Sequence, residues 1–201
     1  MAIDSYSGLQ TEVGEWLQRS DLSARIPVFI EMATARFNRE LRVPEMETLV
    51  TTSADAEYTD LPPDFLQIRS IETNGDRMEY LAPEEFQDYV AATATPAVPV
   101  YTIADMSLRI YPAPSASSTL TLKVLYYKRI PELDTAGATN WLLDAHPDAY
   151  LFGALVEAAG FLHDDPRMSV WDARLQQAMS LINRRGRQMN QGAASMTIKV
   201  A

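Results

Sequence analysis

The sequence predicts an α+β protein: a helical bundle of N- and C-terminal helices, an inserted small antiparallel β-sandwich or barrel, and an extended C-terminal tail. Three observations predict this fold. Apolar residues recur at three- and four-residue steps in residues 1–44 and again in 141–190, which is the period of an amphipathic helix. Residues 45–140 change to alternating patterns and turn signals, as short strands do. Residues 191–201 follow as an extended C-terminal arm.

The composition fits a folded chain of ordinary domain size. The chain has 201 residues, of which 47% are hydrophobic, so it can bury one core and carry a modest insertion. Its longest apolar run lies within residues 149–156, far short of the roughly 20 residues that cross a bilayer. No secretory signal is visible at the start. Zero cysteines exclude disulfides and thiolate metal sites.

The N-terminal segment predicts a pair of helices between residues 6 and 41. Ser7 stands at capping-box spacing near the start of the first helix, and Pro27 fits the first turn of the second, where a missing N–H costs nothing. Ser20-Asp21 separates the two, and Pro44 ends the second. The two apolar stripes are Tyr6, Leu9, Val13, Trp16 and Leu17, then Ile26, Phe29, Ile30, Ala33, Phe37 and Leu41.

The middle segment predicts five or six short strands and one helix. Asn74-Gly75-Asp76 is a strong hairpin signal because Asn and Gly accept positive φ, and residues 104–106 form a second turn. Residues 83–90 predict a short helix with a proline at its first position and acids at the positive end of its dipole. The strands are expected at Met46–Val50, Gln67–Ile71, Tyr101–Ile103, Ser107–Tyr111 and Leu120–Tyr127.

Two further helices are expected after a polar turn at residues 140–147. The first covers residues 148–162 and carries Gly153 and Gly160 on its apolar face, where small residues let a neighbouring backbone approach closely. Asp165-Pro166 is a good N-cap and N1 pair for the second helix, which runs from Arg167 to about Arg185. Its buried stripe is Trp171, Leu175, Ala178, Met179 and Ile182, and Arg184, Arg185 and Arg187 around Gly186 close it.

The net charge of −10 is concentrated in the middle of the chain. Residues 45–140 hold six basic residues against 15 acidic ones, a net of −9. A protein that grips nucleic acid by neutralising phosphates has the opposite sign. The charge therefore argues against tight DNA binding, whereas a conduit that lets DNA pass without sticking tolerates an acidic lining.

Motifs that carry chemistry are almost absent. His146 and His163 lie at opposite ends of one predicted helix, roughly 25 Å apart at 1.5 Å per residue, so they cannot share a metal within a straight helix. His163 beside Asp164 and Asp165 is a weak candidate site, with a helix end as the simpler explanation. Phosphate loops, dinucleotide fingerprints and the Gly-x-Ser-x-Gly elbow are missing. Helix-dipole complementarity explains Glu84-Glu85 without catalysis.

Two features remain as candidate binding sites. Arg184, Arg185 and Arg187 could touch nucleic acid or an acidic partner, or could simply be a solvated helix end. The terminal residues alternate like a strand with nothing after them to pair with, and could add to a sheet edge of another subunit. These terminal residues are Met196, Thr197, Ile198, Lys199 and Val200.

The order of the motifs resembles the head-to-tail adaptor (connector) proteins of tailed bacteriophages, the tail tubular protein A-like family of short-tailed phages. The matching elements span most of the chain, although each is degenerate and none is catalytic. They are Glu15–Leu22, Ala35–Arg42, Tyr101–Ile103, Leu108–Pro112 and the hairpin Trp141–Arg185.

This resemblance implies a structural virion protein without enzymatic activity, cofactor or metal. Such subunits form a ring, usually of twelve copies, beneath the portal protein, extend the DNA channel and present a docking surface for tail nozzle, tube or fibre proteins. The C-terminal arm would reach the portal, and DNA would pass without sequence-specific binding. The place implied is the virion neck, after synthesis in the host bacterial cytoplasm. Two alternatives stay open: a small carboxylate-dependent hydrolase, and a β-sandwich binding module flanked by helices.

Overall fold

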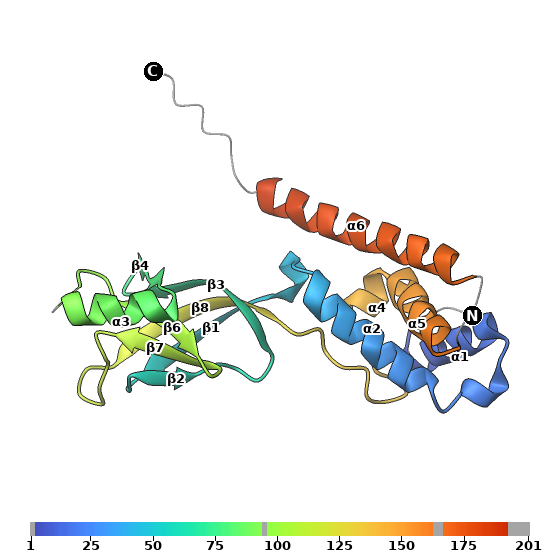
Figure 1. Ribbon diagram of the computed structural model, residues 1–201, viewed down its shortest axis with the longest axis horizontal. Coiled ribbons are helices and arrows are strands. Elements are labelled where there is room, and N and C mark those ends of the chain that lie inside the picture. The colour runs from blue at the N-terminus through green and yellow to red at the C-terminus, as the bar shows by residue number, and fades with distance from the viewer. Residues whose placement is uncertain (1–2, 94–95, 163–166, 193–201) are drawn as a thin grey trace, which may run out of the picture. The chain divides into compact units, whose positions relative to one another are not determined.

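The computed structural model describes residues 3–93, 96–162 and 167–192 (Figure 1). These residues contain six α-helices and eight strands. They belong to two compact units. The helical unit takes its residues from Met1–Met46 and Ile130–Ala201, and the β unit is Glu47–Arg129. The predicted α+β class is confirmed. The predicted arm from Met196 to Val200 and the predicted cap at Asp165-Pro166 lie outside the described residues.

The N-terminal helical pair is confirmed as α1 (Tyr6–Leu17) and α2 (Ile26–Glu40), with the short 3₁₀ helix η1 (Ser20–Leu22) between them. The cap predicted at Ser7 is wrong by two positions, because the side chain of Ser5 accepts the hydrogen bond from the Gly8 N–H at 3.3 Å. Pro27 stands in the first turn of α2, as predicted. Trp16 is 43% exposed, and its ring meets Phe152 edge-on.

The centre of the helical unit is α5 (Pro147–Leu162), which contacts α1, α2, α6 (Met168–Gly192) and the short helix α4 (Trp141–Ala145). The predicted polar turn at residues 140–147 is wrong, because Asn140 caps the N-terminus of α4 and a helix of one turn forms there. Gly153 lies against Ala33 and Phe37 of α2, so the predicted close approach is confirmed at that position. It is wrong at Gly160, where a Cβ would meet nothing within 4 Å.

Helix α6 runs to Gly192 and does not end near Arg185 as predicted. Gly186 is buried inside the helix, where an added Cβ would lie 2.8 Å from Val43 Cγ1 and 3.3 Å from Pro44 Cδ. Its missing side chain lets the helix approach η2 (Pro44–Met46). The residue that looked like a helix terminator is therefore a packing contact. The predicted buried stripe of Trp171, Leu175, Ala178, Met179 and Ile182 is confirmed.

Two four-stranded sheets form the β unit. One has the order β1 (Glu47–Ala54), β8 (Leu120–Lys128), β3 (Phe65–Thr73), β4 (Asp76–Arg77). The other has the order β2 (Tyr58–Asp60), β7 (Ser107–Tyr111), β6 (Val100–Ala104), β5 (Glu79–Tyr80). Buried residues of both sheets form one core, among them Ile71, Tyr101, Leu108, Leu122 and Val124.

The sheets are antiparallel apart from one pair, β5 and β6, which is parallel. The prediction of a purely antiparallel insertion is wrong at that pair. Parallel neighbours need a long crossover, and α3 (Pro83–Ala92) lies in the chain between the two strands. Both predicted turns are confirmed by positive φ: Asn74 and Gly75 (52° and 92°) join β3 to β4, and Asp105 and Met106 (49° and 60°) join β6 to β7.

Deprotonation of Tyr126 is expected to lower the stability of the β unit at alkaline pH. Its side chain is 3% exposed, and its hydroxyl donates to Asp64 Oδ1 at 3.0 Å. Burial, together with this hydrogen bond and the Asp64 charge, raises the pKa of Tyr126 from 10.0 to about 12. Because the folded-state pKa exceeds the unfolded one, the stabilisation is complete below pH 10 and is lost as the pH rises through about 12.

A Tyr126→Phe variant is therefore expected to weaken the alkaline loss of stability of the β unit. The measurement is urea unfolding at a series of pH values on both sides of the ordinary tyrosine pKa of 10.0, followed by circular dichroism. An equally steep alkaline loss in both proteins would contradict this account of Tyr126.

Candidate functional site

The arginines singled out from the sequence lie on the exposed surface of α6. Arg184, Arg185 and Arg187 are all exposed, and none of them has an ion pair within the described part of the chain. The other predicted binding residues, Met196–Val200, lie outside the described residues. The structure therefore locates the arginine cluster on α6, while the binding role of the arm stays a prediction.

The outward surface of α6 is basic. Its one acidic residue, Asp172, has its carboxylate 3.7 Å from Arg36 of α2. Arg174, like the three arginines further along, has no carboxylate partner among the described residues. A surface with four unpaired guanidinium groups can bind an acidic partner.

Apolar side chains stand between these arginines. Val170 is 59% exposed and Leu181 is 44% exposed. Positions four or seven residues apart lie on the same face of a helix. This spacing holds for residues 170, 174, 181 and 185. We call the exposed stripe Val170, Arg174, Leu181 and Arg185 the α6 ridge. It alternates apolar and cationic side chains and lies beside the buried stripe of the same helix.

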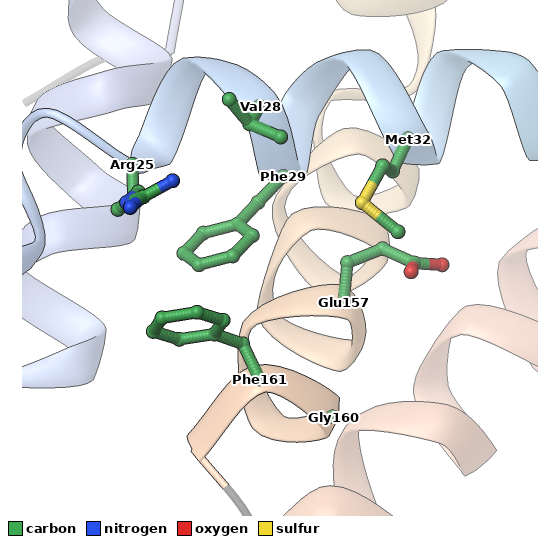
Figure 2. Close-up of a pocket in the computed structure, with 7 residues that line it drawn as sticks. All are labelled: Arg25, Val28, Phe29, Met32, Glu157, Gly160 and Phe161. Carbon is green, nitrogen blue, oxygen red and sulfur yellow. The ribbon is translucent and has the colours of Figure 1, made fainter.

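A groove opens between α2 and α5 (Figure 2). Its volume is about 340 Å³. The rings of Phe29 and Phe161 face each other at 5.7 Å between centroids, and the Arg25 guanidinium lies 5.9 Å from the centre of the Phe161 ring. Gly160 also lines the groove, and a Cβ at this position would meet nothing within 4 Å. We call this surface the α2–α5 groove; its lining residues are Arg25, Val28, Phe29, Met32, Glu157, Gly160 and Phe161.

The α2–α5 groove is mostly apolar, with one guanidinium, Arg25, and one carboxylate, Glu157, among its lining residues. Val28, Met32 and Phe161 are 44%, 48% and 51% exposed. Figure 2 shows the Met32 thioether and the Glu157 carboxylate at the same end of the groove. Glu157 has no cation partner among the described residues. Such a surface can take up apolar side chains, but its lining presents no nucleophile and no acid–base pair.

The titratable residues weighed from the sequence are spread over the fold. Among residues 3–93, 96–162 and 167–192, no three His, Cys, Asp or Glu side chains come together in a way that could hold a metal ion. His146 follows the end of α4, while His163 and the acids beside it lie outside the described residues. Glu84 and Glu85 occupy the first turn of α3, as predicted. No described helix is long and apolar enough to span a membrane.

The sequence did not predict the α2–α5 groove. Val28 and Met32 fall off the buried stripe of α2, and Leu181 falls off that of α6. Apolar residues on the polar side of an amphipathic helix are the signal that could have revealed both surfaces. That signal is weak for single residues, because isolated exposed apolar side chains are common on protein surfaces.

Comparison with known proteins agrees with this picture of a binding protein. A family model described as SU10 adaptor protein matches residues 4–197 of the chain. A search of curated proteins finds no match. The matched range covers nearly the whole chain, including the helical unit, the β unit and part of the predicted C-terminal arm. The chain therefore belongs to the SU10 adaptor protein family, and is a structural protein of the phage head-to-tail adaptor type.

Proposed function

We propose that this protein is a subunit of a ring that lies beneath the phage portal, extends the DNA channel and gives the tail its docking surface. The family match over residues 4–197 carries the proposal. Membership of an adaptor family implies association with phage portal and tail proteins and a place in the virion neck. Twelve copies per ring, the portal as direct partner and a role in DNA ejection are parts of the proposal.

The charge distribution supports a channel that lets DNA pass. The β unit, Glu47–Arg129, holds six basic residues against 12 acidic ones. An acidic surface repels the phosphate backbone, so DNA would slide past it without being held. The chain acts in this proposal by assembly, without catalysis, cofactor or bound metal.

The C-terminal arm is the proposed contact with the portal. Its apolar residues alternate with polar ones from Met196 to Val200, so that one side of an added strand would be apolar. We propose that the bundle is formed by residues 1–44 and 141–190. The β-rich insertion is then residues 45–140, and the arm is residues 191–201. The basic residues Arg184, Arg185 and Arg187 in the C-terminal third of α6 would support the arm next to an acidic partner.

Deleting Gly192–Ala201 is expected to leave a folded protein that no longer binds the portal. The described cores are formed by residues that the deletion keeps, and the deletion removes the proposed contact. The measurement is co-sedimentation with portal rings from the same phage, with circular dichroism as a check on folding. Portal binding that survives the deletion would contradict the proposed role of the arm.

Two matched variants test whether the arm binds the portal as an added strand or as an extended segment without fixed pairing. Replacing Met196, Ile198 and Val200 by serine removes one side of the proposed strand and should abolish portal binding. Replacing Thr197 by serine and Lys199 by glutamine changes the other side and should leave most of the binding. Equal losses in the two variants would contradict strand addition.

A further inference from the structure

We propose that the C-terminal arm of one copy adds as a strand to the free side of β1 in a neighbouring copy. We call this acceptor, the unpaired side of Glu47–Ala54, the β1 edge. The inference rests on the proposed function, because it needs an arm that forms a strand and copies that lie side by side in a ring. It goes beyond the contact with the portal. A strand has two hydrogen-bonding edges, so an arm that pairs with β1 keeps its other edge for the portal.

The β1 edge is the one long, unprotected sheet edge in the described part of the chain. Its sheet has the order β1, β8, β3, β4, so β1 pairs only with β8. The strands at the other three sheet edges, β4, β2 and β5, have two or three residues, whereas β1 has eight. Natural proteins protect sheet edges with short strands, bulges, lysine or proline. β1 has no lysine and no proline, and its register with β8 is unbroken from Glu47 to Ala54.

The backbone of the β1 edge specifies an extended strand as its occupant. In an antiparallel strand the N–H and C=O groups of alternate residues point to opposite sides. One side of β1 is paired with β8, and no other described segment makes a backbone hydrogen bond to β1. The other side is therefore a row of unpaired donors and acceptors. A row of this kind is matched by another extended backbone, which supplies acceptors and donors at the same spacing.

The side chains of β1 specify that one side of the added strand is apolar. Val50 lies opposite Val124 of β8, so it faces the core of the β unit. Val124 is 4% exposed, yet Val50 is 36% exposed. The core is thus partly open at the β1 edge, and an added strand would cover Val50 by placing apolar side chains on that side. The opposite side of β1, with Leu49, Thr51 and Ser53, is exposed and accepts polar side chains.

The C-terminal arm has the pattern that the β1 edge requires. Its apolar residues are Met196, Ile198 and Val200, and the polar residues between them are Thr197 and Lys199. Successive side chains of a strand point to opposite sides, so the three apolar residues would all lie on the side of Val50. Residues 45–60 carry five acidic residues and no basic one, whereas residues 191–201 carry one lysine and no acid. Addition of the arm therefore brings no further carboxylate to this acidic segment.

The donor and the acceptor are different parts of the chain. A contact between two different surfaces is heterologous, and heterologous contacts form a ring when the rotation between subunits closes. The same arm-to-edge contact can therefore repeat from one copy to the next around the proposed ring.

Disulfide trapping tests the contact directly, since the chain has no cysteine. One full-length copy carries Val50→Cys, and a second full-length copy, tagged to differ in mass, carries Ile198→Cys. Met196→Cys and Val200→Cys cover the neighbouring registers of the strand. Two cysteines form a bridge only when they are close and their Cβ atoms point toward each other. Thr197→Cys is therefore the matched control, because it is adjacent to Ile198 but faces the other side of an added strand.

We expect the best of the apolar-side cysteines to crosslink to Val50→Cys about tenfold or more above Thr197→Cys. With Leu49→Cys, which faces the other side of β1, the preference should reverse. Yields that do not depend on the side of the strand would overturn the proposal, and would leave the β1 edge to an extended segment of a tail protein. A dominant Val50–Val50 crosslink would overturn it as well, because β1 would then pair with itself.

Competition by peptides tests the same contact without any change to the fold of the protein. An unlabelled peptide of residues 192–201, added in excess, should suppress the crosslink between the two copies. A peptide with Ile198→Lys should need about tenfold or more higher concentration for the same suppression, because it loses a buried apolar side chain. A peptide with Thr197→Lys has the same added charge on the other side and should compete like the normal peptide. Equal competition by the two lysine peptides would contradict an added strand.

The outcomes separate this contact from the proposed function, because no portal is present in these mixtures. Crosslinks with the expected side preference, in a protein that binds no portal, would overturn the proposed neck function and support the contact between copies. Portal binding that needs the arm, together with crosslinks that show no side preference, would overturn the contact and leave the neck function standing.

Discussion

An Asn140→Ala variant is expected to lose about 3 kcal/mol of unfolding free energy in the helical unit. The Asn140 side chain is 5% exposed and makes three hydrogen bonds. Its Oδ1 accepts from the Leu143 N–H at 2.9 Å, which caps α4. Its Nδ2 donates to the Pro131 carbonyl at 2.8 Å and to the Tyr150 hydroxyl at 2.9 Å.

The size of this loss follows from the cap that the variant removes and from the buried hydrogen-bonding groups that lose a partner. A lost cap costs about 1 kcal/mol, and a buried polar group left without its partner costs about 1–3 kcal/mol. Tyr150 is fully buried, so water cannot easily replace the amide donor, and the other partner of its hydroxyl, Thr34 Oγ1, is at 3.5 Å. Asn140→Ser keeps an acceptor for the cap but lacks the amide donors, and should recover only about 1 kcal/mol.

Tryptophan fluorescence during urea unfolding measures this loss in the right unit, because Trp16, Trp141 and Trp171 all belong to the helical unit. Ser5→Ala is the matched control, since Ser5 caps α1 through a single 3.3 Å bond at a part-buried site. Its expected loss is about 0.5–1 kcal/mol. Equal losses in the Asn140 and Ser5 variants would contradict a buried network at Asn140.

A Gly153→Ala variant is expected to lose about 2 kcal/mol, although alanine favours a helix over glycine by up to about 1 kcal/mol. The new Cβ would lie 2.9 Å from Phe37 Cζ and 3.0 Å from Ala33 Cβ. Phe37 cannot move aside easily, because its ring is fully buried and packs edge-on against Tyr150 at 5.2 Å between centroids. Helices α2 and α5 would have to separate.

Gly160→Ala in the same helix is the matched control for the Gly153 variant. A Cβ at Gly160 would meet nothing within 4 Å, so only the helix preference remains and stability should rise by up to about 1 kcal/mol. Urea unfolding followed by tryptophan fluorescence gives both values. Changes of the same sign at the two glycines would contradict the assigned contact between α2 and α5.

Much of the fold could be predicted because its signals are local. The apolar period located α1, α2 and α5, and the positive φ that Asn74-Gly75 accepts located a hairpin. The wrong predictions concern contacts between residues that are distant in sequence. Gly186 looks the same in sequence whether it ends a helix or packs on Val43, and the parallel pairing of β5 with β6 depends on a crossover through α3.

The candidate surfaces were predicted less well than the fold. The arginines of α6 were found because a run of cations is visible in one short segment. The α2–α5 groove was not found, because it exists only where Val28 and Met32 of α2 meet Phe161, more than a hundred positions later in the chain. Asn140 looked like a turn residue, since its partners Pro131 and Tyr150 come together only in the folded bundle.

The mass of the complex formed with portal rings from the same phage tests the central claim most directly. Mixing those rings with an excess of the 201-residue chain and measuring native mass reports how many copies bind. The account predicts a complex of fixed composition, with twelve copies of the chain on each portal ring and no free positions. Portal rings and chain that remain separate, or that combine in no fixed ratio, would contradict the assignment of this protein as the adaptor ring.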